Sequence, residues 1–517
     1  MATGFLHEVK FRLFFFSHWI FKKYLVGDKI CIKLSMMEKI SFLGSYVKGR
    51  FQSPSKKNFI KKHISPADFK DLIFTWPEKN TGEIDSAILA GKTAHKNWAR
   101  LSLKERVKRL SPLKTIIKQN INPWAELISR ETGKPLWESQ GEVKALLSKT
   151  DFVLKEGLTR IQDQTVPQAK GRIRFKSRGL LLVIGPFNFP MLLPLGQILP
   201  ALAVGNTVIF KPSEKTPASG QKLTQAFDRL DLGSGVFQMI QGGAEVSKKL
   251  CQHKEIDGAL FTGSFEVGQK IKESIVKDFS KILVLEMGGY NSALIWEDAD
   301  LDLAVKETLK GCFWTSGQRC SSTSQIVLHK KIAKDFTKKF IKSAQEIKGD
   351  HWSKNSLMGS LIDSKSIQRF FDLQKEIKDR GGKALLEGKQ ILKEKGYYVS
   401  PGLYKMKFDK NSSFGTKESF TPQVIFYETD SLDQALEMIN HSGYGLSLSV
   451  FSKNKKIQEE IFHRAKVGLI NHNLSTAGAS SYLPFGGLGK SGNDRPAGAF
   501  AIDFCVTPLA EKTKGDF

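Results

Sequence analysis

Hydrophobic positions recur at helical spacing over an early part of the chain. From about residue 85 to 160, apolar side chains return every three or four residues, as in IDSAILAGKTAHKNWARLS and KERVKRLSPLKTIIKQN. This spacing predicts amphipathic helices with one apolar face. Gly133 and Pro135 interrupt the pattern, so we expect one helix to end and another to begin there.

The period changes near residue 179, where short and continuously apolar runs appear. The five runs occupy 179–190, 206–214, 235–243, 258–264 and 281–289. Amphipathic stretches such as 219–230 separate them. Apolar strands that alternate with helices predict a parallel sheet covered on both faces. Ligands of such sheets bind outside the carboxyl ends of the strands, so the residues after each run are candidates for a site.

A second alternating stretch, from about 291 to 475, predicts another α/β domain. The segments expected to form its strands are 321–330, 400–406, 421–428 and 445–452. The tail at 500–510 also alternates, and we expect an edge strand there. The pattern as a whole predicts an α/β fold class.

Composition adds little to this picture, because 517 residues with 40% hydrophobic and 25% charged positions are ordinary for a globular protein of two or three domains. The cysteines are Cys31, Cys251, Cys312, Cys320 and Cys505. Their odd number and the lack of a Cys-x-x-Cys pair argue against a disulfide framework or a zinc site. A reducing, cytoplasmic environment and no bound metal are therefore expected.

A formal net charge of +27 raises the question of an anionic partner. The lysines are spread along the whole chain, often beside glutamates, and no basic stripe with interleaved aromatics accompanies them. We therefore expect no nucleic-acid partner. A basic surface does favour anionic substrates.

The segment 11–26 is apolar, but basic residues interrupt it and it is shorter than the about 20 residues that cross a membrane. We interpret residues 1–36 as an extension that is disordered or lies upstream of the true start at Met36 or Met37. A helix lying in a membrane interface is the alternative. No membrane partner is expected.

Two residues are candidates for covalent chemistry. Cys320 follows Gly-Gln-Arg and precedes a polar Ser-Ser-Thr, so it belongs to a loop, where a reactive thiol needs partial exposure and electropositive surroundings. The alternative, a buried small hydrophobic residue, suits Cys312 and Cys505 better. Glu286 ends an apolar run and is either a solvated strand end or a base with a raised pKa.

Glycines suggest one phosphate site and one coincidence. Gly263-Ser264 ends a predicted strand and opens a helix, whose free N–H groups favour phosphate. A literal G-x-G-x-x-G motif occurs at Gly487, Gly489 and Gly492. It has no strand–helix–strand unit around it, and we interpret it as a coincidence.

Seven motifs, taken together and in order, resemble those of the aldehyde dehydrogenase superfamily over about residues 66–510. The motifs are PFNFP (186–190), KPSE (211–214), FTGS (261–264), LEMGG (285–289), GQRC (317–320), ESF-x-P (418–422) and PFGG (484–487). The resemblance implies NAD(P)-dependent oxidation of a small aldehyde to a carboxylic acid.

The same resemblance implies a domain organisation. A Rossmann-type cofactor domain is expected over 37–290, a catalytic α/β domain over 291–475, and a substrate loop with an oligomerisation strand over 476–517. A small β arm near 160–178 belongs to the cofactor domain and is expected to pair across subunits. A homodimer or homotetramer follows from this arrangement.

Roles are implied residue by residue. Cys320 is the nucleophile that forms a thiohemiacetal, Asn188 holds the developing oxyanion, and Glu286 activates the water that releases the acid. The implied cofactor residues are Phe187, Lys211, Glu214, Gly263, Ser264, Gly268, Glu418 and Phe420. A carboxylate near the ribose hydroxyls favours NAD over NADP.

Two positions depart from the family pattern. Thr421 stands where a glycine is usual, which puts the local backbone in doubt. Phe187 replaces the Trp or Tyr of many members.

The C-terminal stretch 471–510 narrows the substrate. With 129–143, 184–202 and 236–243, it resembles the branch of the superfamily that oxidises N-succinylglutamate 5-semialdehyde in arginine degradation. The glutamate semialdehyde (pyrroline-5-carboxylate) branch or another semialdehyde dehydrogenase is the alternative, and a non-catalytic binding protein of the same fold is a remote one. Both substrates carry an α-carboxylate, for which Ser321, Gly478 and Ala479 are the candidate contacts. A tight loop without a ligand is the alternative for this segment.

Overall fold

The structure is a computed structural model that describes residues 40–52, 59–77, 83–493, 495 and 497–514. The expected extension at 1–36 lies outside these residues. Ser41–Phe517 forms one compact unit. Within the described ranges, no helix has the length and apolar character needed to span a membrane, and no group of His, Cys, Asp and Glu side chains is arranged to hold a metal ion.

A seven-stranded sheet carries the first half of the chain. In sheet order the strands are β11 (Ile282–Met287), β10 (Gly258–Gly263), β7 (Leu180–Ile184), β8 (Thr207–Lys211), β9 (Phe237–Met239), β1 (Ser45–Val47) and β2 (Arg50–Gln52). The five predicted strands are confirmed, and they pair in parallel. β1 and β2 extend the sheet with antiparallel pairs. Each has only three residues, which is too short for a periodic pattern to predict a strand.

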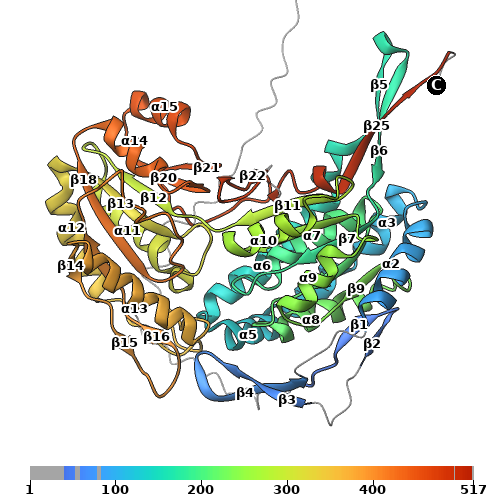
Figure 1. The fold of residues 1–517 in the computed structure, drawn as a ribbon, viewed down its shortest axis with the longest axis horizontal. Coiled ribbons are helices and arrows are strands. Elements are labelled where there is room, and N and C mark those ends of the chain that lie inside the picture. Colours follow the sequence, from blue (N-terminus) through green and yellow to red (C-terminus); the bar gives the residue numbers. More distant parts are fainter. Residues whose placement is uncertain (1–39, 53–58, 78–82, 494, 496, 515–517) are drawn as a thin grey trace, which may run out of the picture. The chain divides into compact units, whose positions relative to one another are not determined.

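Helices cover both faces of this sheet, as predicted (Figure 1). Alternate side chains of a strand point to opposite faces, so Leu181 and Val183 enter one core and Leu180 and Leu182 the other. The helices are α2 (Ile84–Trp98), α3 (Leu103–Leu110), α4 (Leu113–Gln119), α5 (Ile121–Thr132), α6 (Leu136–Leu154), α7 (Leu192–Ala203), α8 (Pro217–Asp228), α9 (Ala244–Gln252) and α10 (Phe265–Ile275). The predicted break is confirmed, because Gly133 ends α5 in a left-handed conformation and α6 begins just after Pro135.

A second seven-stranded sheet follows. Its strands in order are β14 (Lys383–Leu386), β17 (Gly402–Lys405), β18 (Gln423–Thr429), β13 (Thr323–His329), β12 (Asn291–Ile295), β20 (Ser447–Phe451) and β21 (Leu469–His472). Its helices are α11 (Leu301–Phe313), α12 (Lys330–Gln345), α13 (Ser364–Asp379), α14 (Leu432–Asn440) and α15 (Lys455–Arg464). Two cores again lie on its two faces. The four predicted strands and the α/β fold class are confirmed, while the domain boundaries stay a prediction.

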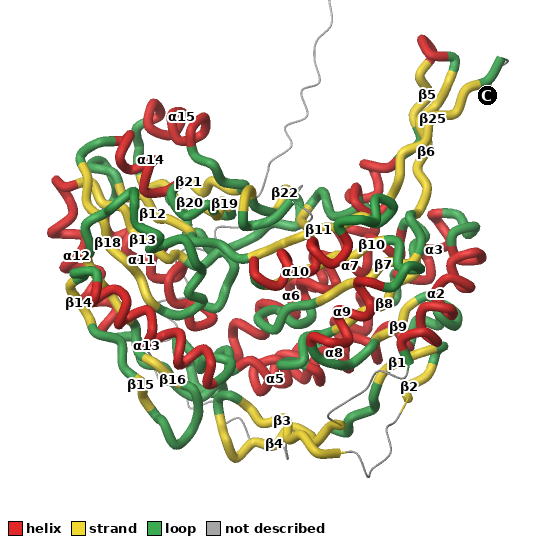
Figure 2. Tube along the Cα trace, viewed as in Figure 1, coloured by secondary structure: helices red, strands yellow, loops and turns green. Residues whose placement is uncertain are grey.

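A three-stranded antiparallel sheet joins distant parts of the chain. β6 (Gly171–Ser177) lies between β5 (Gln164–Val166) and β25 (Val506–Lys512), as Figures 1 and 2 show. The predicted tail strand is therefore an edge strand, but it begins only at Val506. Residues 503–505 form a short 3₁₀ helix instead, because Ile502 and Cys505 pack into the first core.

Smaller antiparallel pairs complete the described chain. They are β3 (Phe59–Ser65) with β4 (Asp68–Pro77), β15 (Gln390–Ile391) with β16 (Tyr398–Val399), β19 (Tyr444–Gly445) with β23 (Leu488–Gly489), and β22 (Pro484–Phe485) with β24 (Ala497–Gly498). The Gly487–Gly492 motif lies among these short bridges and opens no helix, which confirms its interpretation as a coincidence.

Candidate functional site

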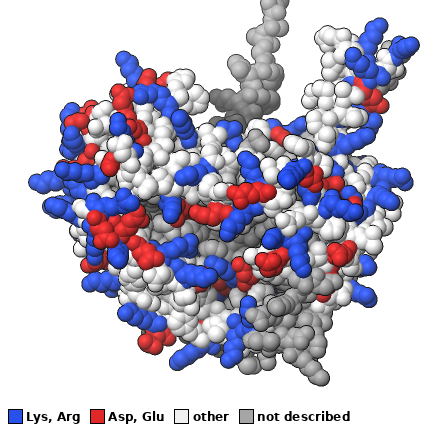
Figure 3. All heavy atoms as spheres, in the orientation of Figure 1, with Lys and Arg blue, Asp and Glu red and all other residues white. Residues whose placement is uncertain are grey.

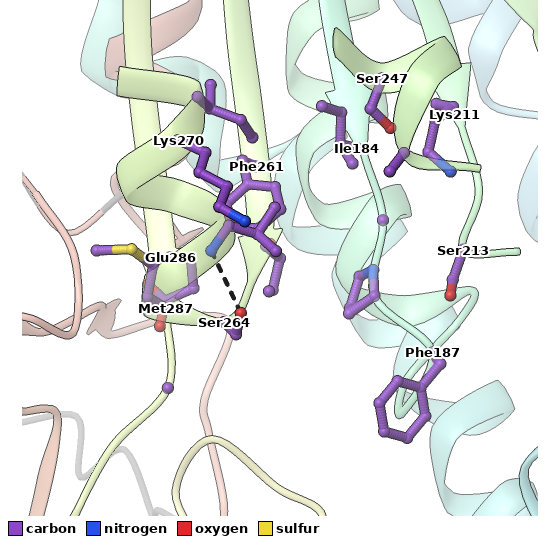
Figure 4. A pocket seen from close by; sticks show the side chains of 18 of the residues that line it. Ile184, Phe187, Lys211, Ser213, Ser247, Phe261, Ser264, Lys270, Glu286 and Met287 are labelled. Atoms are coloured by element: carbon purple, nitrogen blue, oxygen red, sulfur yellow. Dashed lines mark hydrogen bonds between the residues drawn. The ribbon is translucent and has the colours of Figure 1, made fainter. Parts of the chain in front are cut away.

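The carboxyl ends of the parallel strands border a cavity of about 900 Å³. The chain order reverses between β7 and β10, because β8 and β9 follow β7 on one side and β10 and β11 lie on the other. Open α/β sheets bind dinucleotides at such a reversal. Figure 4 shows Ser264 and Lys270 on one side of the cavity and Phe187 and Lys211 on the other.

The start of α10 forms one end of the cavity. Ser264 caps the helix, and its hydroxyl accepts a hydrogen bond from the Val267 N–H at 3.4 Å. The remaining N–H groups of a helix start, with the positive end of the helix dipole, favour a phosphate. Lys270, one turn further on, lines the same cavity. This end therefore suits a pyrophosphate.

Lys211 and Glu214 lie at the end of β8. The Lys211 ammonium is buried, donates hydrogen bonds to the carbonyls of Pro212 and Gly242, and lies 3.7 Å from the Glu214 carboxylate. Burial lowers the pKa of Lys211. The Glu214 side chain is half exposed and lines the cavity, so its oxygens are accessible to the hydroxyls of a ribose.

Cys320 lies on a loop between a short 3₁₀ turn, η4 (Trp314–Gly317), and β13. Thr315 and Ser316 adopt left-handed φ angles of 55°, which side-chain-bearing residues rarely do. Glu138 of α6 stabilises this turn, because its carboxylate accepts hydrogen bonds from the Thr315 N–H and from Arg319, both at 2.8 Å. The loop is therefore held in one conformation.

The second sheet also holds the Cys320 loop. The Asn291 side-chain amide donates to the carbonyl oxygens of Cys320 and Ser322, both at 2.8 Å. Thr476 reaches the strand after the loop, with its hydroxyl 2.8 Å from that of Thr323. Residues distant in sequence thus fix the position of the sulfur.

The surroundings of the Cys320 thiol differ in part from expectation. The side chain is partly exposed and lines the cavity, as a nucleophile requires. The expected electropositive surroundings are wrong, however. Burial raises the pKa of the Cys320 thiol, and the carboxylates of Glu286 and Glu418 raise it further, against smaller opposite effects of the Ser321 N–H and the Arg319 guanidinium.

Glu286 is a buried carboxylate in β11, and its side chain reaches the cavity. Among the described residues, neither of its carboxylate oxygens has a hydrogen-bond partner. Burial raises the pKa of Glu286 well above its ordinary value. An unpaired buried carboxylate costs stability, and one with a raised pKa in a cavity is a candidate for proton transfer. Glu286 was expected to be either a solvated strand end or a base with a raised pKa, and its burial favours the second interpretation.

Asn188 follows β7 and faces the nucleophile loop. Its side-chain amide donates to the Gln318 carbonyl at 2.9 Å, two residues before Cys320. Its backbone carbonyl accepts from the buried Lys134 ammonium at 3.0 Å, which in turn pairs with Glu142 at 2.5 Å. The amide therefore lies beside the Cys320 loop, where an oxyanion donor is required.

Glu418 and Phe420 border the cavity from the second half of the chain. Glu418 accepts a hydrogen bond from the Gly289 N–H at 3.0 Å, and burial raises the pKa of Glu418 to about 8. The Phe420 ring lies edge-on to that of Phe187 at 5.8 Å. Thr421 stands where the family usually has a glycine. The residue with the left-handed conformation at this place is the preceding one, Phe420, with φ of 54°.

Four of the expected site residues do not line the cavity. Gly268 lies within α10, where a Cβ atom would come 2.4 Å from the Met287 sulfur, so its place is explained by packing and not by cofactor contact. Ser321 is buried, and its N–H is directed at the Cys320 sulfur. Gly478 and Ala479 are exposed on the loop after Thr476.

The sequence did not indicate the buried charges behind the site, which are Lys134, Glu138 and Glu142. It also did not indicate Arg369, an exposed residue at the edge of the cavity. Glu138 and Glu142 are four residues apart and therefore share one helix face. Acidic residues at this spacing in an otherwise apolar pattern were the available signal. Periodicity alone predicts that Glu138 and Glu142 are exposed to solvent.

The parts of the cavity fit a nicotinamide dinucleotide: a helix start for phosphates, an accessible carboxylate beside a lysine for a ribose, and paired aromatic rings near the thiol. The fold and the site define an α/β oxidoreductase that binds NAD(P).

Comparisons with known proteins give the family. The model of the aldehyde dehydrogenase family matches residues 52–508. N-succinylglutamate 5-semialdehyde dehydrogenase of Escherichia coli strain 55989 is 32% identical over 472 residues, 90% of this chain and 94% of that protein. The protein of that name from E. coli O7:K1 is 33% identical over 445 residues, 85% of this chain and 90% of that protein. The chain belongs to the aldehyde dehydrogenase family.

Solved structures agree with this assignment. The crystal structure of betaine aldehyde dehydrogenase from Staphylococcus aureus in complex with NAD+ is 26% identical, with a TM-score of 0.86, and the match covers 92% of this chain and 95% of that one. A variant aldehyde dehydrogenase from Bacillus cereus is 26% identical, with a TM-score of 0.85 and coverage of 91% and 96%.

Proposed function

We propose that this protein oxidises N-succinyl-L-glutamate 5-semialdehyde to N-succinyl-L-glutamate with NAD. The observation that carries the chemistry is the meeting of Cys320, Glu286 and Asn188 at one end of a cavity whose other end fits a dinucleotide. The substrate rests on the resemblance of the C-terminal stretch and on the names of relatives that match over nine-tenths of the chain.

The reaction starts at Cys320. Its thiolate attacks the aldehyde carbon, a C–S bond forms, and the carbonyl oxygen takes up the negative charge. The Asn188 amide and the Cys320 N–H are the donors for this oxygen, and one such donor contributes about 3–4 kcal/mol to the transition state. NAD, held by Lys211, Glu214 and the start of α10, would supply the acceptor for the hydride that the thiohemiacetal carbon loses.

Glu286 acts in the second half of the reaction. Its carboxylate takes a proton from water, the resulting hydroxide attacks the thioester carbon, and the C–S bond breaks to release the acid and the thiolate. A raised pKa makes Glu286 a stronger base than an exposed glutamate, which is what activation of water requires.

Glu214 supports NAD as the cofactor. Its accessible carboxylate can accept hydrogen bonds from both ribose hydroxyls, whereas it repels the 2′-phosphate of NADP.

The test is a substrate panel followed by nicotinamide absorbance. It compares N-succinylglutamate semialdehyde, glutamate semialdehyde, succinate semialdehyde and a plain aliphatic aldehyde. We expect kcat/KM to be about 10- to 100-fold higher for N-succinylglutamate semialdehyde than for glutamate semialdehyde. The loss of one charged contact changes kcat/KM by about this factor. A ratio near one, or one in favour of glutamate semialdehyde, moves the chain to the pyrroline-5-carboxylate branch.

A further inference from the structure

Lys149 is a cation that the reaction described above does not use. It lies on α6, and its Cδ and Cε atoms cover Gly196 of α7, at 3.9 and 3.7 Å from where a Cβ atom would stand. A glycine inside a helix is unfavourable relative to alanine. At position 196 the glycine leaves room for the aliphatic part of the Lys149 side chain.

No described carboxylate pairs with this ammonium. Burial is the only cause that shifts its pKa, which falls to about 8. A half-buried cation without a counter-ion is unfavourable in an enzyme at rest and becomes favourable when an anion arrives.

Lys149 lies on the side of α6 that packs against α7. Glu142 lies on the same side of α6 and accepts hydrogen bonds from the N–H groups of Met191 and Leu192, where α7 begins just beyond Asn188. Lys149 follows Glu142 by seven residues, which is two helical turns or about 10 Å along the axis. The face of α7 beside it is the less buried one, with Leu193, a cavity residue, three positions before Gly196.

The C-terminal loop also contacts α6. The exposed Tyr482 ring lies edge-on to that of Phe152 at 5.0 Å, and Phe152 is three residues beyond Lys149 on α6. Gly478 and Ala479, expected from the sequence to contact substrate, belong to this same loop. The helix α6 therefore contacts both α7, whose Leu193 lines the cavity, and the C-terminal loop.

We propose that Lys149 is a specificity-determining residue that binds a carboxylate at the far end of the aldehyde substrate. The proposal rests on the proposed function and extends it to a class, aldehydes with a distal carboxylate. Eight bonds join the aldehyde carbon of N-succinylglutamate semialdehyde to its distal carboxyl carbon. An extended chain advances about 3.5 Å for three bonds, so the distal carboxylate lies roughly 9 Å from the reacting carbon.

The experiment uses substrates matched in length. 9-Oxononanoate has the same eight bonds and ends in a carboxylate, nonanal has nearly the same length without charge, and succinate semialdehyde is too short to reach. The variants are Lys149→Met, Lys149→Arg and, as the matched control, Lys144→Met, which removes an exposed lysine from the same helix.

We expect Lys149→Met to lower kcat/KM by about 10- to 100-fold for N-succinylglutamate semialdehyde and 9-oxononanoate, mainly through KM. Nonanal and succinate semialdehyde should be unaffected. Lys149→Arg should restore most of the loss, and Lys144→Met should behave as the unmodified protein. Thermal unfolding of each variant shows that the fold is retained.

Two results separate this inference from the proposed function. If N-succinylglutamate semialdehyde is not oxidised but Lys149→Met still lowers the ratio of 9-oxononanoate to nonanal, the proposed function fails and the role of Lys149 stands. If N-succinylglutamate semialdehyde is a good substrate but Lys149→Met and Lys144→Met give the same ratio, the role of Lys149 is overturned.

Discussion

Buried charges in this protein fall into two kinds at the residue scale. Lys134, Glu138 and Glu142 are fully paired inside hydrogen-bond networks, as buried ions must be to be tolerated. Glu286 and Lys149 have no opposite charge among the described residues. The paired ions hold loops in position, whereas the unpaired Glu286 lines the cavity and Lys149 is assigned to substrate binding only by our proposal.

The nucleophile is tested by Cys320→Ala. We expect aldehyde oxidation to be lost, because the Cys320 sulfur forms the C–S bond in the proposed reaction, while NAD binding measured by calorimetry is retained. Cys312→Ala is the matched control, since Cys312 is buried in the second core and should keep its activity. Substantial oxidation by the purified Cys320→Ala protein contradicts the assignment.

The base is tested by Glu286→Gln, which keeps the shape but accepts no proton. A pre-steady-state burst of reduced nicotinamide with a slow steady state is expected, since the first half of the reaction survives. Because burial raises the pKa of Glu286, turnover of the unmodified protein should rise with pH through that pKa, and the variant should lack this rise. Equal loss of both phases indicates a different role.

Stability gives an independent readout of the same group. A glutamate whose pKa is raised in the fold binds a proton more tightly there than in the unfolded chain. The free energy of unfolding should therefore decrease as pH rises above about 4.3, the ordinary pKa of glutamate. Glu286→Gln should show a smaller decrease in denaturant titrations at a series of pH values.

Cofactor preference is tested by Glu214→Gln. Removing the negative charge should raise kcat/KM for NADP and lower it for NAD, because the repulsion of a 2′-phosphate disappears with the acceptor for the ribose hydroxyls. The exposed Glu245, which also lines the cavity, gives the control Glu245→Gln. No change in the NADP to NAD ratio contradicts the ribose assignment.

At the scale of elements, the edge strand β11 carries Glu286 and depends on the C-terminal segment. The Asn493 side chain accepts from the Leu285 N–H at 2.6 Å and donates to the Leu283 carbonyl at 2.8 Å. The Met287 N–H donates to the Ser491 carbonyl at 2.8 Å. The outer edge of the sheet is thereby covered, and the base is held between two segments.

Asn493→Ala tests this arrangement. Two hydrogen bonds are lost, each of which contributes about 1 kcal/mol, so the free energy of unfolding should fall by roughly 2 kcal/mol. The hydrolytic phase should slow more than the burst, since only Glu286 is displaced. Asn411→Ala, on an exposed loop, is the control and should change neither. A burst and a steady state slowed alike speak against a specific effect on the base.

At the scale of the molecule, the arm of β5, β6 and β25 leaves one side of β25 unpaired within the described chain. Pairing with another copy covers such an edge. Basic and acidic side chains are interspersed on the face seen in Figure 3, so the charge of +27 does not gather in one patch there.

Assembly is tested by truncation before Val506, which removes β25. Light scattering should give a dimer or tetramer for the full chain and a lower mass for the truncated protein. Truncation after Thr513 keeps β25 and is the control. A full chain that is a stable monomer at micromolar concentration contradicts the expected assembly.

The sequence by itself determined the elements and the order of the motifs. Apolar runs of about five residues between amphipathic stretches predicted β7, β8, β9, β10 and β11, because both faces of a covered parallel sheet exclude water. Gly133 and Pro135 marked a helix boundary through backbone geometry alone. Cys320, Glu286 and Asn188 came from a resemblance in motifs and not from periodicity.

Only the tertiary structure decided which charges are buried and what they contact. Glu138 and Glu142 have the spacing of a solvated helix face, yet they hold the Cys320 loop and the start of α7. Gly268 is a packing position because Met287 lies against it, and the surroundings of Cys320 are acidic because β11 and Glu418 approach it from distant parts of the chain. Burial and charge proximity are properties of contacts between remote segments, and local periodicity contains no information about them.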